Sequence, residues 1–376
     1  MYRAVHYHTV NYRAVNYRAV NYLAVAHRAV AHRAVSAPAW PGLDRLIGYS
    51  WLTLVTTVLL ASRLLAQEPA RLELSPSATA PGQLDPAAGR QGDEFWQIST
   101  RALPELEDDQ FLPDSLTRFP LDVQRYDRHA GWQRQTVGDL WQAAAQLPTV
   151  FYLHGNWTEP PTVGEFGARY YQLLAAGNPP PFRLIYWSWP SERYLRRVRS
   201  DIRAKAERCD TEGWQLAQVL SRWPAAAPVR FVSYSYGGRV VMSALHLHAG
   251  GDWDGRRSPL PGPTRESLFR ALLIAPAMHQ EWIAPGQRLG HALDEVESLT
   301  VLFNPTDRAL RLYHTLFPQE RPRTLGELGL SSQTLGAAAN KVRFFNVSRQ
   351  VGRSHHEPNY LRSGDLAREL PRLLQQ

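Results

Sequence analysis

Ser235 is the residue whose surroundings most strongly indicate a chemical role. It is the middle residue of Ser233-Tyr-Ser-Tyr-Gly237, between an apolar run at 229–232 that predicts a buried strand and an amphipathic segment that predicts a helix. A sharp strand-to-helix turn around a serine is the nucleophile elbow, usually written G-x-S-x-G, which exposes the serine hydroxyl above a sheet. Gly237 and Gly238 are small enough for strand and helix to pass closely, whereas Ser233 takes the place of the first glycine. We therefore predict Ser235 as a nucleophile.

A serine nucleophile needs a general base, and the base needs an acid that orients it. When the chain order is Ser…Asp…His, the acid and the histidine each follow a later strand. Asp307 follows the predicted strand 300–303, where it could also cap the next helix. Glu281, after 271–274, is the alternative acid; Asp307 is favoured because an aspartate in a strand-end turn is the commoner geometry. His355 and His356 both follow 342–347, and the sequence does not separate them, although a Gly-x-x-His approach slightly favours His355.

The stretch His154-Gly155-Asn156-Trp157 follows the predicted strand 150–153. Gly155 allows a tight turn, so that the main-chain N–H of Asn156 or Trp157 can face the site. The N–H of Tyr236, directly after the nucleophile, would be a second donor. Two such donors form an oxyanion hole, each stabilising the transition state by ~3 kcal/mol. The alternative is that His154 and Gly155 only form a tight loop.

Other residues near these loops are candidates for substrate contact. Trp187 and Trp189 end and follow the predicted strand 183–187, where they could wall a pocket or simply pack; His154 and Trp157 are further candidates. The polar segment 250–266 is either a lid or a surface loop. The Arg-rich segment 193–208 is interleaved with acids on a helical period, which favours a solvated helix face over an anion site.

The elements that must position these residues alternate along the chain. Predicted strands lie at 95–99, 150–153, 183–187, 229–232, 271–274, 300–303 and 342–347, and predicted helices at 137–147, 163–176, 191–223, 239–248 and 308–316. This alternation predicts an α/β fold: a mostly parallel twisted sheet with helices on both faces and right-handed crossovers. Ligands of such sheets bind beyond the carboxyl ends of the strands, which is where the candidate residues fall.

The first 93 residues differ from the rest of the chain. Residues 1–40 contain a pentapeptide repeat whose period fits neither a helix nor a strand, and we interpret them as a low-complexity tail or a wrongly assigned start. Residues 41–66 include an uncharged apolar run that suits a signal peptide, with a membrane anchor as the alternative. Residues 67–93 are a Pro- and Ala-rich linker, and 94–376 form the predicted α/β domain. We expect an exported (periplasmic or extracellular) or membrane-anchored protein, with membrane association through 46–65.

The charge of the chain is concentrated outside the predicted domain. The net charge is +8, of which residues 1–40 contribute +5 and 41–66 contribute +1, so that +2 remains for 67–376. This nearly neutral body does not have the charge of a nucleic-acid-binding domain. The single cysteine, Cys209, excludes an internal disulfide and is interpreted as an inert thiol. The remaining histidines lack ligand spacing: His246 and His248 point to different sides of a helix, and we expect no metal.

These motifs together resemble the α/β-hydrolase superfamily and, more narrowly, serine-hydrolase-like proteins of planctomycete-type genomes. The matching features are the His154-Gly155-Asn156 loop, Trp187-Ser-Trp-Pro190, the Ser235 elbow, the loop from Asn304 to Asp307, and the segment from Val351 to Leu361. The resemblance covers about residues 94–370. It implies an eight-stranded-type sheet, a Ser-Asp-His triad, no cofactor and hydrolysis of an ester-like bond.

Two functions follow from these predictions. The first is a serine hydrolase that cleaves a carboxylic ester, thioester or amide of a small-molecule acyl substrate through an acyl-enzyme. The second is a catalytically silent hydrolase-fold protein that binds a ligand or partner at the cell envelope, because the fold does not fix the function. The sequence predicts neither the acyl group nor the oligomeric state.

Overall fold

The central strands of the protein are buried on both faces, as expected for parallel strands covered by helices on two sides. Every residue of β4 (Thr149–Leu153), β5 (Arg183–Ser188) and β6 (Val229–Tyr234) is buried. The structure is a computed structural model that describes residues 89–106, 120–253, 256–257 and 269–375. The predicted tail, signal peptide and segment 46–65 lie outside these residues, as do most of the linker and most of 250–266.

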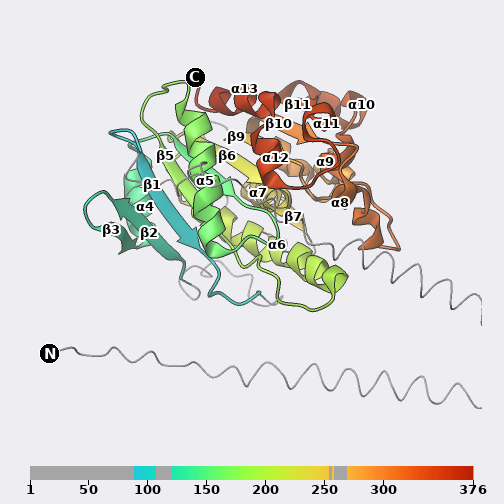
Figure 1. Ribbon diagram of the computed structural model, residues 1–376, viewed down its shortest axis with the longest axis horizontal. Helices are drawn as coiled ribbons and strands as arrows, with labels where there is room; N and C mark the ends of the chain where they lie inside the picture. The colour runs from blue at the N-terminus through green and yellow to red at the C-terminus, as the bar shows by residue number, and fades with distance from the viewer. Residues whose placement is uncertain (1–88, 107–119, 254–255, 258–268, 376) are drawn as a thin grey trace, which may run out of the picture. The chain divides into compact units, whose positions relative to one another are not determined.

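The described strands form a nine-stranded sheet in the order β11-β10-β9-β6-β4-β5-β1-β2-β3 (Figure 1). Seven neighbouring strands, from β11 to β1, are parallel, and β2 and β3 add an antiparallel hairpin at one edge. The remaining strands are β1 (Glu94–Ser99), β2 (Asp122–Asp127), β3 (Gly131–Gln135), β9 (Phe269–Ile274), β10 (Val296–Phe303), β11 (Val342–Asn346), and the separate pair β7 (Asp252–Trp253) and β8 (Arg256–Arg257). The predicted α/β fold with a mostly parallel sheet is confirmed.

Helices cover both faces of the sheet. The helices are α4 (Val137–Ala144), α5 (Pro160–Ala175), α6 (Val198–Ser221), α7 (Tyr236–His248), α8 (Arg308–Arg311), α9 (Leu325–Leu328), α10 (Ser332–Leu335), α11 (Ser348–Val351), α12 (Glu357–Leu361) and α13 (Gly364–Arg372), with 3-10 turns at Gln280–Ile283, Gly290–Leu293, Tyr313–Thr315 and Gly336–Lys341. One layer contains α4, α6 and α7, and the other contains α5, α12 and α13 (Figure 1). Because side chains alternate along a strand, Phe151 of β4 contacts Trp223 beyond α6, while Tyr152 contacts Tyr170 of α5.

Two predicted helices are shorter in the structure. The helix expected at 191–223 begins only at Val198, because the carboxylate of Asp201 accepts the main-chain N–H groups of Tyr194 and Leu195 and so stabilises a loop there. The helix expected at 308–316 is α8 followed by a 3-10 turn. None of the helices in the described part of the chain is both long and apolar enough to cross a membrane.

Candidate active site

Ser235 lies at the sharp turn between β6 and α7. Its φ of 51° and ψ of −116° are unusual for a residue with a side chain. The turn is held by the neighbouring strand β9, because the Ser235 N–H donates to the carbonyl of Ile274 over 2.9 Å and the Ser235 carbonyl accepts from Ala277 over 3.1 Å. This is the backbone arrangement of a nucleophile elbow.

Glycines allow the elbow to pack directly against the loop after β4. A Cβ atom on Gly237 would lie 2.3 Å from the carbonyl oxygen of Leu153, so no larger residue fits there. A Cβ on Gly155 would lie 2.7 Å from the Tyr234 ring and 3.1 Å from the Cβ of Ser235. The Gly155 turn and the serine are therefore in close contact.

Ser233, the departure from the glycine pattern, fits without a clash. Its side chain is buried on β6, and a Cβ on Gly238 would still be 3.6 Å from Ser233 Oγ, an ordinary contact. Among the described residues its hydroxyl has no hydrogen-bond partner. The serine is thus sterically accommodated at this position, at the cost of an unsatisfied hydroxyl.

The structure brings together Ser235, His355 and Asp307. Ser235 Oγ lies 3.0 Å from His355 Nε2, and His355 Nδ1 lies 2.7 Å from Asp307 Oδ2. If Nδ1–H donates to the carboxylate, Nε2 is left as the acceptor for the serine hydroxyl. This chain of contacts is geometrically able to move a proton from Ser235 to His355.

Asp307, just beyond the end of β10, makes hydrogen bonds with both of its carboxylate oxygens. Its Oδ1 accepts the N–H groups of Ala309 and Leu310 at the start of α8, so it caps that helix as well as contacting His355. Its Oδ2 also accepts the hydroxyl of Tyr360 over 2.8 Å. The carboxylate is fully buried, so these contacts fix its orientation.

The two alternative residues do not join this group. His356 is exposed at the start of α12. Glu281 is exposed in the 3-10 turn Gln280–Ile283, where it lines a cavity with His279 and Trp282. Of each pair of candidates, the residue that the structure brings to Ser235 is therefore the first: His355 contacts Ser235, and Asp307 contacts His355.

Two main-chain N–H groups beside Ser235 lack a partner within the described residues. The N–H of Trp157 donates to the carbonyl of Ser191 over 2.7 Å, which leaves Asn156 as the donor from its loop. Tyr236 is the first residue of α7, and first-turn N–H groups have no acceptor within their own helix. Tyr236 directly follows Ser235, and Asn156 directly follows Gly155, which packs against Ser235, so both segments adjoin the serine as an oxyanion hole would require.

His154 supports the loop from inside the protein. It is fully buried: its Nε2 accepts the N–H of Trp189 over 3.1 Å, and its ring stacks on the Trp189 indole. Burial, assisted by the charge of Arg101, lowers the pKa of His154 to about 3. His154 is therefore a neutral scaffold residue.

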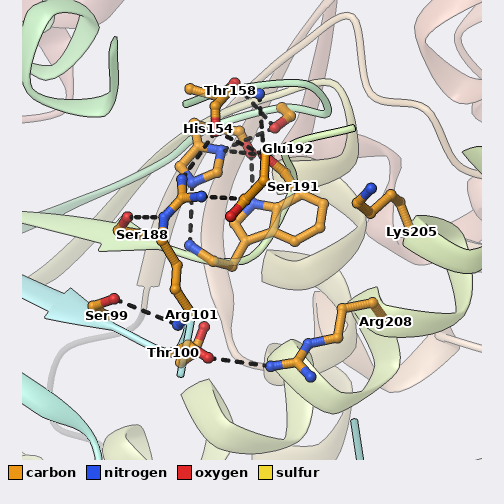
Figure 2. A network of polar contacts seen from close by, with 12 residues as sticks. Ser99, Thr100, Arg101, His154, Thr158, Ser188, Ser191, Glu192, Lys205 and Arg208 are labelled. Carbon is orange, nitrogen blue, oxygen red and sulfur yellow. Dashed lines mark hydrogen bonds and ion pairs between the residues drawn. The ribbon is translucent and has the colours of Figure 1, made fainter. Parts of the chain in front are cut away.

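Arg101 has a structural role that no sequence pattern indicates. Its guanidinium donates to Ser188 Oγ over 2.8 Å, to the carbonyl of Thr158 over 2.9 Å, and to the carboxylate of Glu192 (Figure 2). It therefore ties together the segments that follow β1, β4 and β5. Ser191 adds a second link, because its Oγ accepts the N–H of Thr158 over 3.2 Å.

The expectation that three of the aromatic candidates contact substrate needs correction. His154, Trp187 and Trp189 have no exposed surface in the structure, so they pack within the fold instead of lining an open pocket. The indole N–H of Trp187 donates to Glu212 over 3.0 Å. Trp157, in contrast, is 47% exposed.

Other potentially reactive residues take no part in the hydrogen bonds of Ser235, His355 and Asp307. Cys209 is buried on α6, and burial raises the pKa of its thiol. Within the described residues, no three His, Cys, Asp or Glu side chains gather as metal ligands would.

Comparisons with known proteins find similarity at the level of the fold. No family model matches the chain, and no curated protein matches it. The structure of acyl-protein thioesterase 2 from Zea mays is 17% identical with a TM-score of 0.35, over 61% of this chain and 94% of the thioesterase. Esterase B from Lactobacillus rhamnosis is 11% identical with a TM-score of 0.30, over 88% and 97% of the two chains. Esterase 2 from Thermogutta terrifontis is 11% identical with a TM-score of 0.29, over 62% and 82%. Likenesses with TM-scores this low do not establish the activity of this chain.

Proposed function

We propose that the protein is a serine hydrolase that cleaves an ester-like bond through an acyl-enzyme intermediate. The observation that carries this proposal is a chain of two contacts. Ser235 Oγ lies 3.0 Å from His355 Nε2, and His355 Nδ1 lies 2.7 Å from Asp307 Oδ2. Distances in this range allow proton transfer between nucleophile and base. The strained φ of Ser235 supports the same proposal, because backbone strain of this kind concentrates at functional sites.

The proposed reaction has two halves. In the first, His355 removes the proton from Ser235 Oγ as the oxygen attacks the acyl carbon, and Asp307 stabilises the imidazolium. The N–H groups of Asn156 and Tyr236 hold the negative oxygen of the tetrahedral intermediate. His355 then gives its proton to the leaving group, and the acyl group stays on Ser235. In the second half, His355 activates a water in the same way, and the acid leaves.

The proposed substrate is a small-molecule carboxylic ester, thioester or amide, and the reaction requires no cofactor. The alternative is a catalytically silent binding protein of the cell envelope. It would be favoured if Asp307, or both histidines, pointed away from Ser235, and the contacts of Asp307 and His355 give it no support. Export or membrane anchoring through 46–65, and the narrower resemblance to planctomycete-type proteins, stay predictions; mass spectrometry of the mature N-terminus tests the first.

A fluorophosphonate probe tests the proposal directly. Such a probe phosphonylates a serine that an adjacent base activates, so we expect one label on Ser235 in the folded full-length protein, located by peptide mass spectrometry. Ser235→Ala is the control and must abolish labelling. A folded wild-type protein without a label on Ser235 would overturn the proposal. A panel of p-nitrophenyl esters of increasing acyl length then defines the preferred acyl group.

A further inference from the structure

Asp201, in the first turn of α6, is a fully buried carboxylate near the proposed oxyanion hole. Its Oδ1 accepts the N–H groups of Tyr194 and Leu195 and the ammonium of Lys205, over 3.0, 2.9 and 3.2 Å. Its Oδ2 accepts the indole N–H of Trp157 over 2.8 Å. Burial favours the neutral form of Asp201, but the hydrogen bonds outweigh it and lower the pKa of the carboxyl.

The position of this carboxylate is fixed by groups on its own segment. Lys205 is also fully buried, and its ammonium lies 3.8 Å from the centre of the Tyr194 ring as well as beside Asp201. A buried ion pair with additional hydrogen bonds on the carboxylate has few alternative arrangements. Asp201 is thus a rigid acceptor for the Trp157 indole.

Trp157 needs such an acceptor, because its backbone is strained and its ring is poorly packed. Its φ is 57°, in the region that residues with a side chain rarely occupy, and the residue is 47% exposed. The main-chain N–H bond to Ser191 and the indole N–H bond to Asp201 hold it at two points. Trp157 directly follows Asn156, so fixing Trp157 also restricts the orientation of the Asn156 N–H.

The next residue of α6 contacts the other side of the site. The hydroxyl of Tyr236 donates to the carbonyl of Ile202 over 3.2 Å. Two consecutive residues of α6 therefore hold the two segments that bear the proposed oxyanion donors. We propose that Asp201 is a positioning residue of the oxyanion hole, which it holds in place through the indole N–H of Trp157. This rests on the proposed function.

Trp157→Phe is the first test, because it removes the indole N–H and keeps an aromatic ring. A displaced donor weakens binding of the transition state more than binding of the substrate, so we expect kcat on p-nitrophenyl acetate to fall at least about tenfold while KM changes less than about threefold. Trp141→Phe is the matched control: it removes an indole N–H bond to the carbonyl of Val219, between α4 and α6. It should leave kcat unchanged.

A thionoester provides a readout that general loss of structure does not affect. Sulfur accepts hydrogen bonds weakly, so an enzyme with a well-placed oxyanion hole prefers the oxygen ester over the matched thionoester. We expect the ratio of the two kcat/KM values to fall at least about fivefold in Trp157→Phe and to stay at the wild-type value in Trp141→Phe.

The double variant tests whether Asp201 acts through Trp157. Asp201→Asn leaves one acceptor oxygen, which the three donors at Oδ1 retain, and puts an NH2 group where Oδ2 accepted the indole N–H. It should therefore lower kcat as Trp157→Phe does, and the double variant should lose no more than about twofold beyond Asp201→Asn, because both changes break the same contact. Losses that multiply would overturn the proposal. A Trp157→Phe enzyme with the wild-type kcat and the wild-type ratio of ester to thionoester rates would also overturn the proposal. This second test does not depend on whether Asp201→Asn folds. Failure of the proposed function would instead appear as absence of fluorophosphonate labelling at Ser235 in the wild type. Complete labelling of the wild type therefore distinguishes failure of this inference from failure of the proposed function.

Discussion

The hydroxyl of Tyr234 donates a hydrogen bond to the main-chain carbonyl of His355 over 2.7 Å. The residue before the proposed nucleophile thus holds the main chain of the proposed base, and the two rings lie 5.3 Å apart. The link comes from β6 and fixes the loop between α11 and α12. It explains how one of two adjacent histidines is directed at Ser235.

Alanine substitutions of the adjacent histidines should have very different effects. His355→Ala should lower kcat/KM for p-nitrophenyl acetate by at least about 10³-fold, because the serine loses its base. His356→Ala should change it less than about threefold, because His356 is exposed and does not contact Ser235. Initial-rate measurements on the two purified variants check this. Similar losses in both would show that the geometry around His355 is not the working one.

Substitutions of the two candidate acids, Asp307 and Glu281, should also have very different effects on kcat. Asp307→Asn keeps the shape of the side chain but removes the charge that stabilises the imidazolium, and we expect kcat to fall about 10⁴-fold. Glu281→Gln should leave kcat within about twofold of wild type, because Glu281 is exposed on another turn. A large effect of Glu281→Gln would contradict the assignment of Asp307.

Gly237→Ala should damage the elbow, whereas Gly164→Ala should not. The new methyl at 237 would lie 2.3 Å from the carbonyl oxygen of Leu153, so backbone atoms must move. We expect destabilisation by about 2 kcal/mol or more and loss of Ser235 labelling. Gly164 lies within α5 with open space around it, so alanine there should stabilise by about 0.5–1 kcal/mol. Urea denaturation measures both, and a Gly237→Ala protein of wild-type stability would refute the close contact.

The sequence predicted the parallel part of the sheet well, because buried strands are continuous runs of apolar residues. It missed the hairpin of β2 and β3, whose residues are largely polar since the hairpin lies at the edge of the sheet. A turn signal was present: Asp127 accepts the N–H groups of His129 and Ala130, and Gly131 follows with a φ of 73°.

The positions of Ser235, Asp307 and His355 could be predicted because each follows a predicted strand. The direction of a side chain within a loop could not, which is why His355 and His356 stayed ambiguous. Tyr360 and Arg101 were missed because their contacts, with Asp307 and Thr158, join residues far apart in sequence. Whether His154 and the two tryptophans line a pocket or pack within the fold could not be predicted, because proximity to a site does not reveal burial.

Ser233→Ala should make the protein more stable without loss of activity. The Ser233 hydroxyl is buried with no hydrogen-bond partner in the described residues, so its removal eliminates a desolvation cost of about 1 kcal/mol. Ser191→Ala is the matched control, because the equally buried Ser191 hydroxyl contacts the Thr158 main chain, and its loss should destabilise by about 1 kcal/mol. Thermal denaturation compares the two; a lower melting temperature for Ser233→Ala would indicate that its hydroxyl does have a partner.

Glu357 should make the stability of the protein depend on pH. This carboxyl is fully buried beside the site, where Tyr152 and Tyr170 both donate to its Oε1, over 3.0 and 2.9 Å. Burial raises the pKa of Glu357 to about 8. Between the ordinary pKa of an unfolded glutamate and pH 8, the folded protein therefore keeps a proton that the unfolded chain releases. The contribution of Glu357 to stability is full below about pH 4.5 and is lost as the pH rises to 8, by about 4 kcal/mol in total.

Glu357→Gln should remove this dependence, because glutamine is neutral at every pH and can still accept both tyrosine hydroxyls. The free energies of unfolding of wild type and variant, measured by urea denaturation at pH 5 and pH 8, should diverge: the variant should gain stability relative to wild type as the pH rises. The difference between the free energies of unfolding of the two proteins cancels the contributions of other titrating groups, such as His154. Glu281→Gln, which changes an exposed carboxyl, should follow the wild type. Parallel curves for Glu357→Gln and wild type would mean that Glu357 is already ionised in the folded protein at pH 5.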